Sequence, residues 1–167
     1  VITKNRTNPA YVGARLGADR VLLANALSSV HFAPENPDDI VEQRDLVRKA
    51  IKLSPSAIVL APAHVTNMKD VLEEVYAAEI PLFCIVSEPE PTSAITFIGS
   101  DDQSLARGMA IRLARHLGER GNIVIINGHP DSATSAPRAA GFRQGLEAFP
   151  DIVVRGERPG DYQRDRA

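Results

Sequence analysis

The chain has 167 residues, about the length of one ordinary globular domain. Its composition, with 44% hydrophobic and 24% charged residues, is that of a folded globular protein and excludes a disordered tail, a collagen-like chain and a coiled coil. The formal net charge of −2 argues against a general nucleic-acid binder, and the longest apolar runs are far shorter than the ~20 residues of a membrane helix. We therefore expect neither a nucleic-acid partner nor a membrane span in this segment.

Strand and helix patterns alternate along the first hundred residues. Asn8 followed by Pro9 predicts a helix start, because Asn accepts hydrogen bonds from free backbone N–H groups and Pro suits the first helical position. Helices are expected from there to about Leu27, from Pro37 along a face of Ile40, Val47 and Ile51, and after a cap at Thr66. The expected strands are a stub at Val1–Thr3, then Ser28–Ala33, Ala57–Ala61, Pro81–Val86 and Ile95–Ile98.

The second half repeats this alternation. The expected elements are a helix over about Asp102–Leu117 with Leu105, Met109, Leu113 and Leu117 at i+4 spacing, a strand Asn122–Ile126, a helix Ser135–Ala148 and a strand Ile152–Arg155. Near-continuous Val and Ile runs joined by crossover helices indicate parallel sheets covered on both faces. The predicted fold class is therefore α/β, in two runs of which the second holds only two strands and two helices.

A stretch without helical pattern, residues 88–103, separates the two α/β runs and is expected to hold a hinge. The first run begins late, because Val1–Thr3 is only the stub of a first strand. A sheet with as few strands as the second run offers would leave a hydrophobic edge uncovered. We therefore expect the chain to be part of a longer protein.

Charge is uneven between these halves. Residues 1–103 carry 9 Lys and Arg against 14 Asp and Glu, whereas residues 104–167 carry 10 arginines against 7 acidic residues. An arginine-rich segment could form a phosphate-binding stripe. The arginines are dispersed at helical spacing, however, which favours solvated helix faces.

Enzyme and metal signatures are absent. The single cysteine, Cys84, lies within the apolar run 82–86, which excludes an internal disulfide and favours a buried small hydrophobe over a nucleophile. The four histidines lack ligand spacing, and the turn after the first strand lacks the glycines of a dinucleotide or phosphate loop. There is no G-x-S-x-G and no H-E-x-x-H motif. We expect no catalytic residue, no metal and no cofactor.

Polar residues follow several predicted strands at their carboxyl ends, which is where open α/β sheets bind ligands. In the first run these candidates are Asn8, Tyr11, Ser87, Glu88 and the group Ser100, Asp101 and Asp102. In the second run they are His129, Asp131, Thr134 and Arg138.

Each candidate has a structural alternative. These are a helix cap for Asn8 and for Asp101 or Asp102, a core aromatic for Tyr11, turn residues for Ser87 and Glu88, and a loop residue for His129. Arg138 is the sharpest candidate, because an arginine in the first turn of a helix opposes the helix dipole and needs an anionic or hydroxyl-rich partner.

Five segments carry a family pattern in their order and spacing. They are Thr7-Asn8-Pro9-Ala10-Tyr11, Asp45-Leu46 with Ser56–Pro62, Ala78–Leu82, Ile98–Asp102 through Arg107-Gly108, and Gly128 followed by Arg138-Ala139-Ala140-Gly141-Phe142. Together they resemble the type I periplasmic sugar-binding proteins of the ribose-binding-like group. The resemblance covers essentially the whole chain.

This resemblance implies two Rossmann-like lobes joined by crossover strands that close on a ligand between them, with the second lobe incomplete here. It implies an N-terminal lobe over residues 1–99 with a truncated first strand, a hinge crossover at 100–103, and the first half of a C-terminal lobe over 104–167. It implies that Asn8 and Tyr11 contact sugar from the first lobe and that Arg138 binds sugar hydroxyls from the second. Two departures stand out: Val86-Ser87 occupies the place of an aspartate and an arginine, and Ala10 replaces a stacking aromatic. A solute smaller or more polar than a typical sugar, such as a polyol, fits these departures.

Three functions remain open at this point. The leading hypothesis is a non-catalytic periplasmic receptor that delivers a small, sugar-like solute to the membrane permease of an ABC importer by hinge closure. The first alternative is the effector-sensing domain of a cytoplasmic lactose-repressor-type regulator, and the coding sequence upstream, a signal peptide or a DNA-binding module, discriminates between the two. The second alternative is a doubly wound enzyme, which needs a nucleophile–base pair or a cofactor loop.

Overall fold

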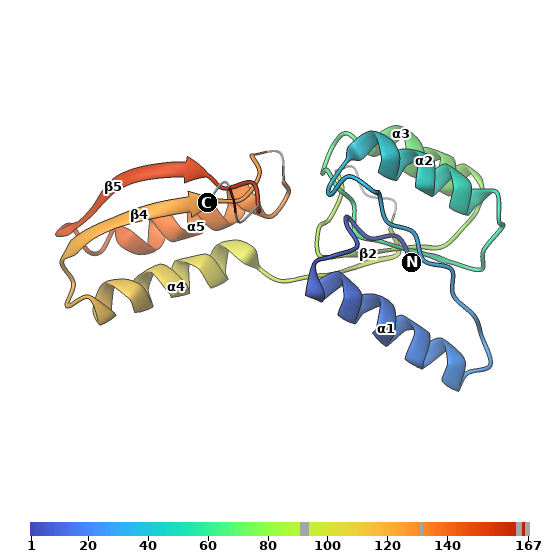
Figure 1. Cartoon of the computed structure of the whole chain (residues 1–167), viewed down its shortest axis with the longest axis horizontal. Coiled ribbons are helices and arrows are strands. Elements are labelled where there is room, and N and C mark those ends of the chain that lie inside the picture. Colours follow the sequence, from blue (N-terminus) through green and yellow to red (C-terminus); the bar gives the residue numbers. More distant parts are fainter. Residues whose placement is uncertain (91–93, 131, 163–164, 166–167) are drawn as a thin grey trace. The chain divides into compact units, whose positions relative to one another are not determined.

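The computed structural model describes residues 1–90, 94–130, 132–162 and 165, and the chain divides into two compact units, Val1–Gly99 and Ser100–Ala167 (Figure 1). Each unit has its own hydrophobic core and its own parallel sheet. No helix among the described residues is long and apolar enough to cross a membrane. The units are described separately below.

The sheet of the first unit is parallel, as the apolar runs predict. Its strands lie in the order β1 (Ile58–Leu60), β2 (Leu82–Ile85) and β3 (Thr96–Ile98). Near the N-terminus, Ile2 makes isolated parallel bridges to Leu60 on one side and to Phe32 on the other. The chain before Asn8 therefore leaves the sheet at the same edge as the residues that follow β1 and β2.

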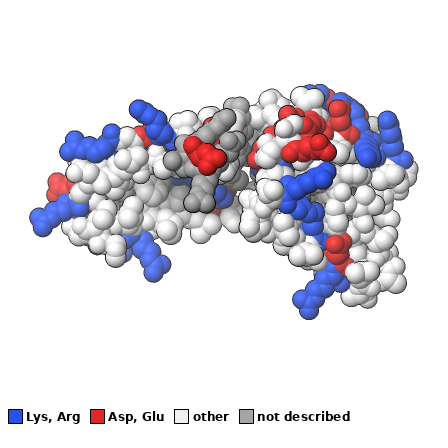
Figure 2. Space-filling model, viewed as in Figure 1, with Lys and Arg blue, Asp and Glu red and all other residues white. Residues whose placement is uncertain are grey.

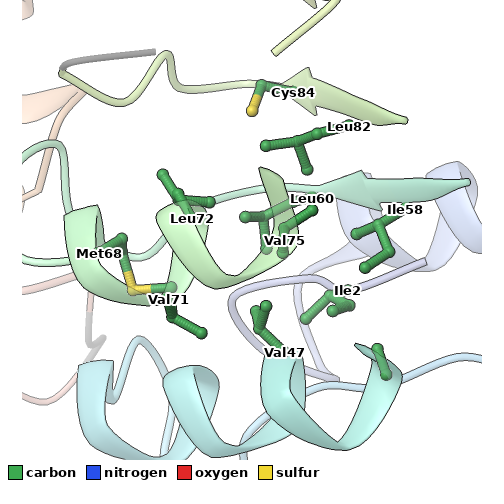
Figure 3. Close-up of a cluster of buried hydrophobic side chains, with 11 residues drawn as sticks. Ile2, Val47, Ile58, Leu60, Met68, Val71, Leu72, Val75, Leu82 and Cys84 are labelled. Carbon is green, nitrogen blue, oxygen red and sulfur yellow. The ribbon is translucent and has the colours of Figure 1, made fainter. Parts of the chain in front are cut away.

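Helices cover both faces of this sheet. Figure 1 shows α2 (Ile40–Ile51) and α3 (Lys69–Ala77) together on one side and α1 (Pro9–Ala24) on the other. The core lies between the sheet and the α2–α3 pair, and Figure 3 shows Val47, Val71, Val75 and the strand residues converging there. Cys84 is part of this core as predicted, and its burial, assisted by the negative charge of Glu88, raises the pKa of the thiol to about 11.

The second unit pairs two helices with a two-stranded parallel sheet. Its elements in chain order are α4 (Asp102–His116), β4 (Gly121–Asn127), α5 (Ser135–Leu146) and β5 (Ile152–Pro159). The helices pack closely because small residues meet: Ala110 and Ala114 of α4 are buried, and Gly141 and Gly145 of α5 lie against the backbone of α4. A Cβ at Gly141 would collide with the carbonyl oxygen of Gln103.

The helix starts and one strand differ from the sequence prediction. Asp39, not Pro37, caps α2 by accepting from the Glu42 N–H, and Met68, not Thr66, precedes α3 without a side-chain cap. The expected strand over residues 28–33 is reduced to the single bridge at Phe32. The Asp39 cap is a local feature, since Asp is a preferred N-cap residue. The loss of the strand depends on pairing with distant segments, which local residue preferences do not report.

The apolar face predicted for α4 does not form the core of the second unit. Leu105 and Met109 are exposed, whereas the alanines Ala110 and Ala114 face α5. The i+4 spacing identified a helix, but it did not identify which face is packed. The small residues at the contact between α4 and α5 allow the two helix backbones to approach each other closely.

The arginines of the second unit do not gather into a stripe on the face shown in Figure 2, where the basic side chains stand apart from one another. Two of them pair with acids within the unit, Arg138 with Asp102 and Arg143 with Glu157. On that face, the arrangement of the arginines favours solvated side chains over a phosphate-binding stripe.

Candidate functional site

A buried lysine marks the carboxyl edge of the first unit's sheet. Lys4 Nζ donates to Ser87 Oγ at 2.7 Å, and both residues are 3% exposed. Ser87 was predicted from its place after β2, but Lys4 was not, because a charged residue in a short N-terminal stub is read as a surface side chain. The two residues are 83 positions apart in the chain and meet only because their strands run parallel.

The turn after β2 presents Ser87 to this lysine. Val86 has a φ of 68°, and the Ser87 N–H donates to the Ile85 carbonyl at 2.7 Å, so these residues form a γ-turn. Val86 also donates its own N–H to the Ile98 carbonyl of β3 at 3.0 Å. A β-branched residue with positive φ is strained, and such strain concentrates at functional sites.

Asn8 and Tyr11 stand at the start of α1, as predicted. Asn8 Oδ1 accepts from the Ala10 N–H at 2.9 Å, which makes Asn8 a helix cap, and its own N–H donates to Asn5 Oδ1 at 2.9 Å. Tyr11 is the buried residue of α1. Glu88 is exposed next to Ser87. A ligand-binding role for these residues stays a prediction.

Two further side chains hold the loops that carry these candidates. Arg15 donates to Thr3 Oγ1 at 2.6 Å and to the backbone carbonyls of Asn5 and Arg6. Gln43, fully buried on α2, donates to the carbonyls of Thr3 and Ala61 and accepts from the Ala63 N–H at 2.6 Å. Gln43 therefore ties the segment before Lys4 to the segment after β1.

In the second unit, Arg138 on α5 pairs with Asp102 on α4, with Nε and Oδ1 2.9 Å apart. The anionic partner that the sequence called for is thus present within the unit. Both residues line a hollow of about 560 Å³ whose walls include Leu105, Met109, Val124, Ile126 and Phe142. The remaining candidates lie in the loop after β4: His129 is exposed, Thr134 Oγ1 lies 3.1 Å from the Tyr162 hydroxyl, and Asp131 lies outside the described residues.

The candidates Ser100–Asp102 precede or begin α4. Asp101 accepts from the Ser104 N–H at 2.9 Å and caps the helix, which is the structural alternative given for it above. These bonds, first the Ser104 backbone N–H and then its hydroxyl, hold the pKa of Asp101 below its usual value. Asp102 is not the cap, because its carboxylate is engaged by Arg138.

The sequence did not reveal a cluster of Asp19, Ser29 and His31. His31 Nε2 lies 2.6 Å from Asp19 Oδ1, and the Ser29 hydroxyl donates to the same carboxylate oxygen. In a hydrolase triad the serine addresses one ring nitrogen of the histidine and the acid holds the other. Here the serine and the acid lie at the same ring nitrogen, since Ser29 Oγ is 3.2 Å and Asp19 Oδ1 2.6 Å from His31 Nε2. Nδ1 of His31 is buried without a hydrogen-bond partner, so the cluster is not arranged for nucleophilic catalysis.

The described residues hold no group of three or more His, Cys, Asp or Glu that could bind a metal ion.

The sequence and the structure of the chain were compared with those of known proteins. The family model of the periplasmic binding protein domain matches residues 1–167. The chain belongs to this family.

The relatives and solved structures agree with the membership. The periplasmic binding protein domain described here is 24% identical over 165 residues to a D-apiose import binding protein of Actinobacillus succinogenes, an alignment covering 98% of this chain and 53% of the relative. It is 26% identical over 151 residues to a xylitol-binding protein of Mycolicibacterium smegmatis, covering 90% of this chain and 43% of the relative. The chain spans about half the length of the curated relatives it matches.

A solved periplasmic solute-binding protein of an ABC transporter from Actinobacillus succinogenes, with bound D-allose, superposes on this periplasmic binding protein domain with a TM-score of 0.90. The identity is 19%, and the match covers 99% of this chain and 60% of that one. A carbohydrate-transporter solute-binding protein from Agrobacterium radiobacter in complex with D-arabinose gives a TM-score of 0.88 at 20% identity, covering 96% and 56%. The predicted family and the predicted α/β fold with parallel sheets are confirmed.

Proposed function

We propose that this periplasmic binding protein domain binds a small polar solute, a sugar or a polyol, and does so without catalysing a reaction. The observation that carries the proposal is the collection of polar side chains at the carboxyl edge of the first unit's sheet, where Lys4 and Ser87 are buried as a hydrogen-bonded pair. The names of the relatives, for D-apiose and for xylitol, support the same class of solute.

The residues proposed to contact the solute are Asn8, Tyr11, Ser87 and Glu88 in the first unit and His129 and Arg138 in the second. Asn8 and Arg138 offer planar polar groups that can replace water around hydroxyls. Tyr11 offers a ring face together with a hydroxyl. The low aromatic content, 5% of residues with no tryptophan, favours a solute bound by hydrogen bonds more than by stacking.

We propose a place for the whole protein in import through an ABC transporter, in the periplasm, with the membrane permease as its partner. Two observations support this proposal. The relative from Actinobacillus succinogenes is named an import binding protein, and the solved structures similar to this chain include solute-binding proteins of ABC transporters. The same support favours transport over the two alternatives, a regulator's effector domain and a doubly wound enzyme.

The test is a thermal-shift and calorimetric screen of the whole protein against pentoses, hexoses and polyols. A solute that binds only the native state stabilises it by roughly 2.7 kcal/mol at a hundredfold excess over Kd, which raises Tm visibly. We expect one or a few solutes to do so and the shift to be lost in Arg138→Ala. Arg112→Ala, at an exposed arginine of α4, is the matched control and is expected to keep it. A flat screen across all three classes contradicts the proposal.

A further inference from the structure

The carboxylate of Glu157 on β5 binds one side chain from each of two neighbouring elements. Asn127, the last residue of β4, and Arg143 of α5 both donate to Glu157 Oε1. Strand register brings the first two together, because Glu157 lies opposite Ile125 in the parallel pair and Asn127, two residues further along β4, projects from the same face as Ile125. Glu157 therefore holds the side chain at the carboxyl end of β4.

This carboxylate dictates how the Asn127 amide is turned. The hydrogen bond from Arg143, and after it the one from Asn127, hold the pKa of Glu157 below its usual value. An ionised carboxylate accepts hydrogen bonds and cannot donate one. Asn127 must therefore turn its amide nitrogen to Glu157, since the amide oxygen in that place would face another acceptor with no proton between them. The amide oxygen is left on the other branch of the side chain.

Asn127 lines two hollows of the second unit, and its neighbours assign one branch of the amide to each. The smaller hollow, of about 340 Å³, is lined by Glu157 and Arg143, whereas the hollow of about 560 Å³ is lined by Arg138 and Asp102. Because the amide nitrogen is bonded on the side of the smaller hollow, the amide oxygen is directed to the larger one. Within the part of the chain that the structure describes, no side chain or backbone N–H donates to Asn127 Oδ1.

The larger hollow thus combines a donor with an acceptor. Arg138 has N–H groups beyond the one bonded to Asp102 and can only donate, whereas Asn127 Oδ1 can only accept. A solute hydroxyl both accepts and donates, so it suits this combination. A solute carboxylate would face Asn127 Oδ1 without a proton, and Asp102 already balances the charge of Arg138. The arrangement therefore favours neutral hydroxyl groups over a carboxylate.

We infer that Asn127 is a specificity-determining residue that accepts a hydrogen bond from a hydroxyl of the solute, with Glu157 as the positioning residue that turns the Asn127 amide. The inference rests on the proposed solute-binding function, and the ligand class that it adds is a neutral polyhydroxyl compound in preference to a sugar acid. Neither residue was a candidate from the sequence, because the bond between them joins positions 30 residues apart.

The experiment is isothermal titration of the whole protein with neutral probes and with acids. The neutral probes are xylitol, D-arabinitol, D-apiose and D-allose, and the acids are xylonate and D-arabinonate, in which a carboxylate replaces one terminal CH₂OH group of the matching polyol. The variants are Asn127→Ala and Glu157→Gln. Their matched controls are Asn122→Ala, at an exposed asparagine near the other end of β4, and Glu147→Gln, at an exposed glutamate after α5. Circular dichroism and Tm establish that each variant is folded.

We expect the wild type to bind the polyols more tightly than the matching acids. Asn127→Ala should weaken binding of the preferred neutral probe by about fivefold, as for one neutral hydrogen bond, and binding of the acid by less, so that the preference narrows. Glu157→Gln should narrow it as well, because an uncharged amide both donates and accepts and no longer dictates how Asn127 is turned. The two control variants keep the wild-type affinities. A wild type that prefers the acids, or a preference that is unchanged in the folded variants, overturns the inference alone.

Deoxyfluoro analogues of the preferred neutral probe separate recognition from a purely structural effect. Fluorine in place of one hydroxyl cannot donate a hydrogen bond. The analogue altered at the hydroxyl that meets Asn127 is expected to lose about fivefold more affinity in the wild type than in Asn127→Ala, whereas equal losses at every position contradict the contact. If Asn127→Ala does not fold, Glu157→Gln and the same analogues decide. A wild type that binds no probe overturns the proposed function and this inference with it.

Discussion

Arg138 on α5 and Asp102 on α4 are joined across 36 residues of sequence by a bond of 2.9 Å between Nε and Oδ1. Asp102 is the more protected partner, with its side chain 13% exposed against 52% for Arg138. The carboxylate therefore positions the guanidinium, which keeps its remaining N–H groups for other acceptors. Asp102 acts on the proposed site through Arg138.

The first prediction concerns this positioning. Asp102→Asn keeps the shape but removes the charge that orients Arg138, and we expect solute affinity to fall about fivefold, corresponding to ~1 kcal/mol for a pair that is half in water. Stability changes little. Titration calorimetry with the solute found in the screen measures the effect, and Glu119→Gln, at an exposed residue after α4, is the control. Unchanged affinity in Asp102→Asn beside a clear loss in Arg138→Ala would show that Asp102 has no positioning role.

A second prediction concerns the buried amide of Gln43. Gln43→Met fills similar space but leaves the Ala63 N–H and the carbonyls of Thr3 and Ala61 without this partner. Each unsatisfied buried group costs about 1–3 kcal/mol, so we expect the free energy of unfolding of the first unit to fall by about 3 kcal/mol. Urea denaturation measures it. Gln144→Met, at an exposed glutamine of α5, should change stability by less than about 0.5 kcal/mol, and equal effects would contradict the assignment.

Much of the fold was accessible from the sequence because its signals are local. The apolar runs at 58–60 and 82–85 are strands in which buried residues alternate with half-buried ones, and Asn8-Pro9 starts α1 with the predicted cap. The strand that failed depends on distant contacts: the segment before Ala33 has strand composition, yet only Phe32 makes a bridge to the sheet region. The start of α2 is set locally, because Asp39 rather than Pro37 has the side chain that accepts from a helical N–H, that of Glu42.

The site was less accessible for the same reason. Ser87 was predicted as a candidate because it directly follows an apolar strand, a signal that is visible in the sequence. Lys4 follows an equally apolar stub, Val1–Ile2–Thr3, but its pairing with Ser87 spans 83 residues and depends on strand order. The cluster of Asp19, Ser29 and His31 likewise joins the end of α1 to the segment after it, with no spacing that a motif would record.

A third prediction tests the contact between α4 and α5. In Gly141→Ala the new methyl group meets the backbone carbonyl of Gln103, which cannot move without shifting α4. We expect the second unit to lose about 2 kcal/mol of stability by overpacking. Gly108→Ala is the matched control, because Gly108 lies within α4 with open space around it and alanine there should stabilise the helix by up to about 1 kcal/mol. Chemical denaturation of both variants gives opposite signs if the packing is as described, and the same sign contradicts it.

The last prediction follows from the carboxylate of Asp19. The Ser29 hydroxyl, and after it His31, hold the pKa of Asp19 below its usual value of 3.8. Because the folded-state pKa lies below that of the unfolded chain, the ionised carboxylate stabilises the native state above pH 3.8, and this contribution is lost as the pH falls through the lower, folded value. Asp19→Asn should therefore be less stable than the wild type at neutral pH, and the two should converge in acid.

The measurement is Tm of the wild type and of Asp19→Asn from about pH 7 to about pH 3, read as a difference. The difference is needed because other carboxyls, Glu42 and Asp101 among them, also have lowered pKa values and destabilise both proteins in acid. Asp45→Asn, at a carboxylate whose side chain is 71% exposed and 3.4 Å from Arg48, is the control and should show little pH-dependent difference from the wild type. A wild-type advantage over Asp19→Asn that persists unchanged at the acid end would mean that the stabilisation comes from the shape of the cluster and not from the charge on Asp19.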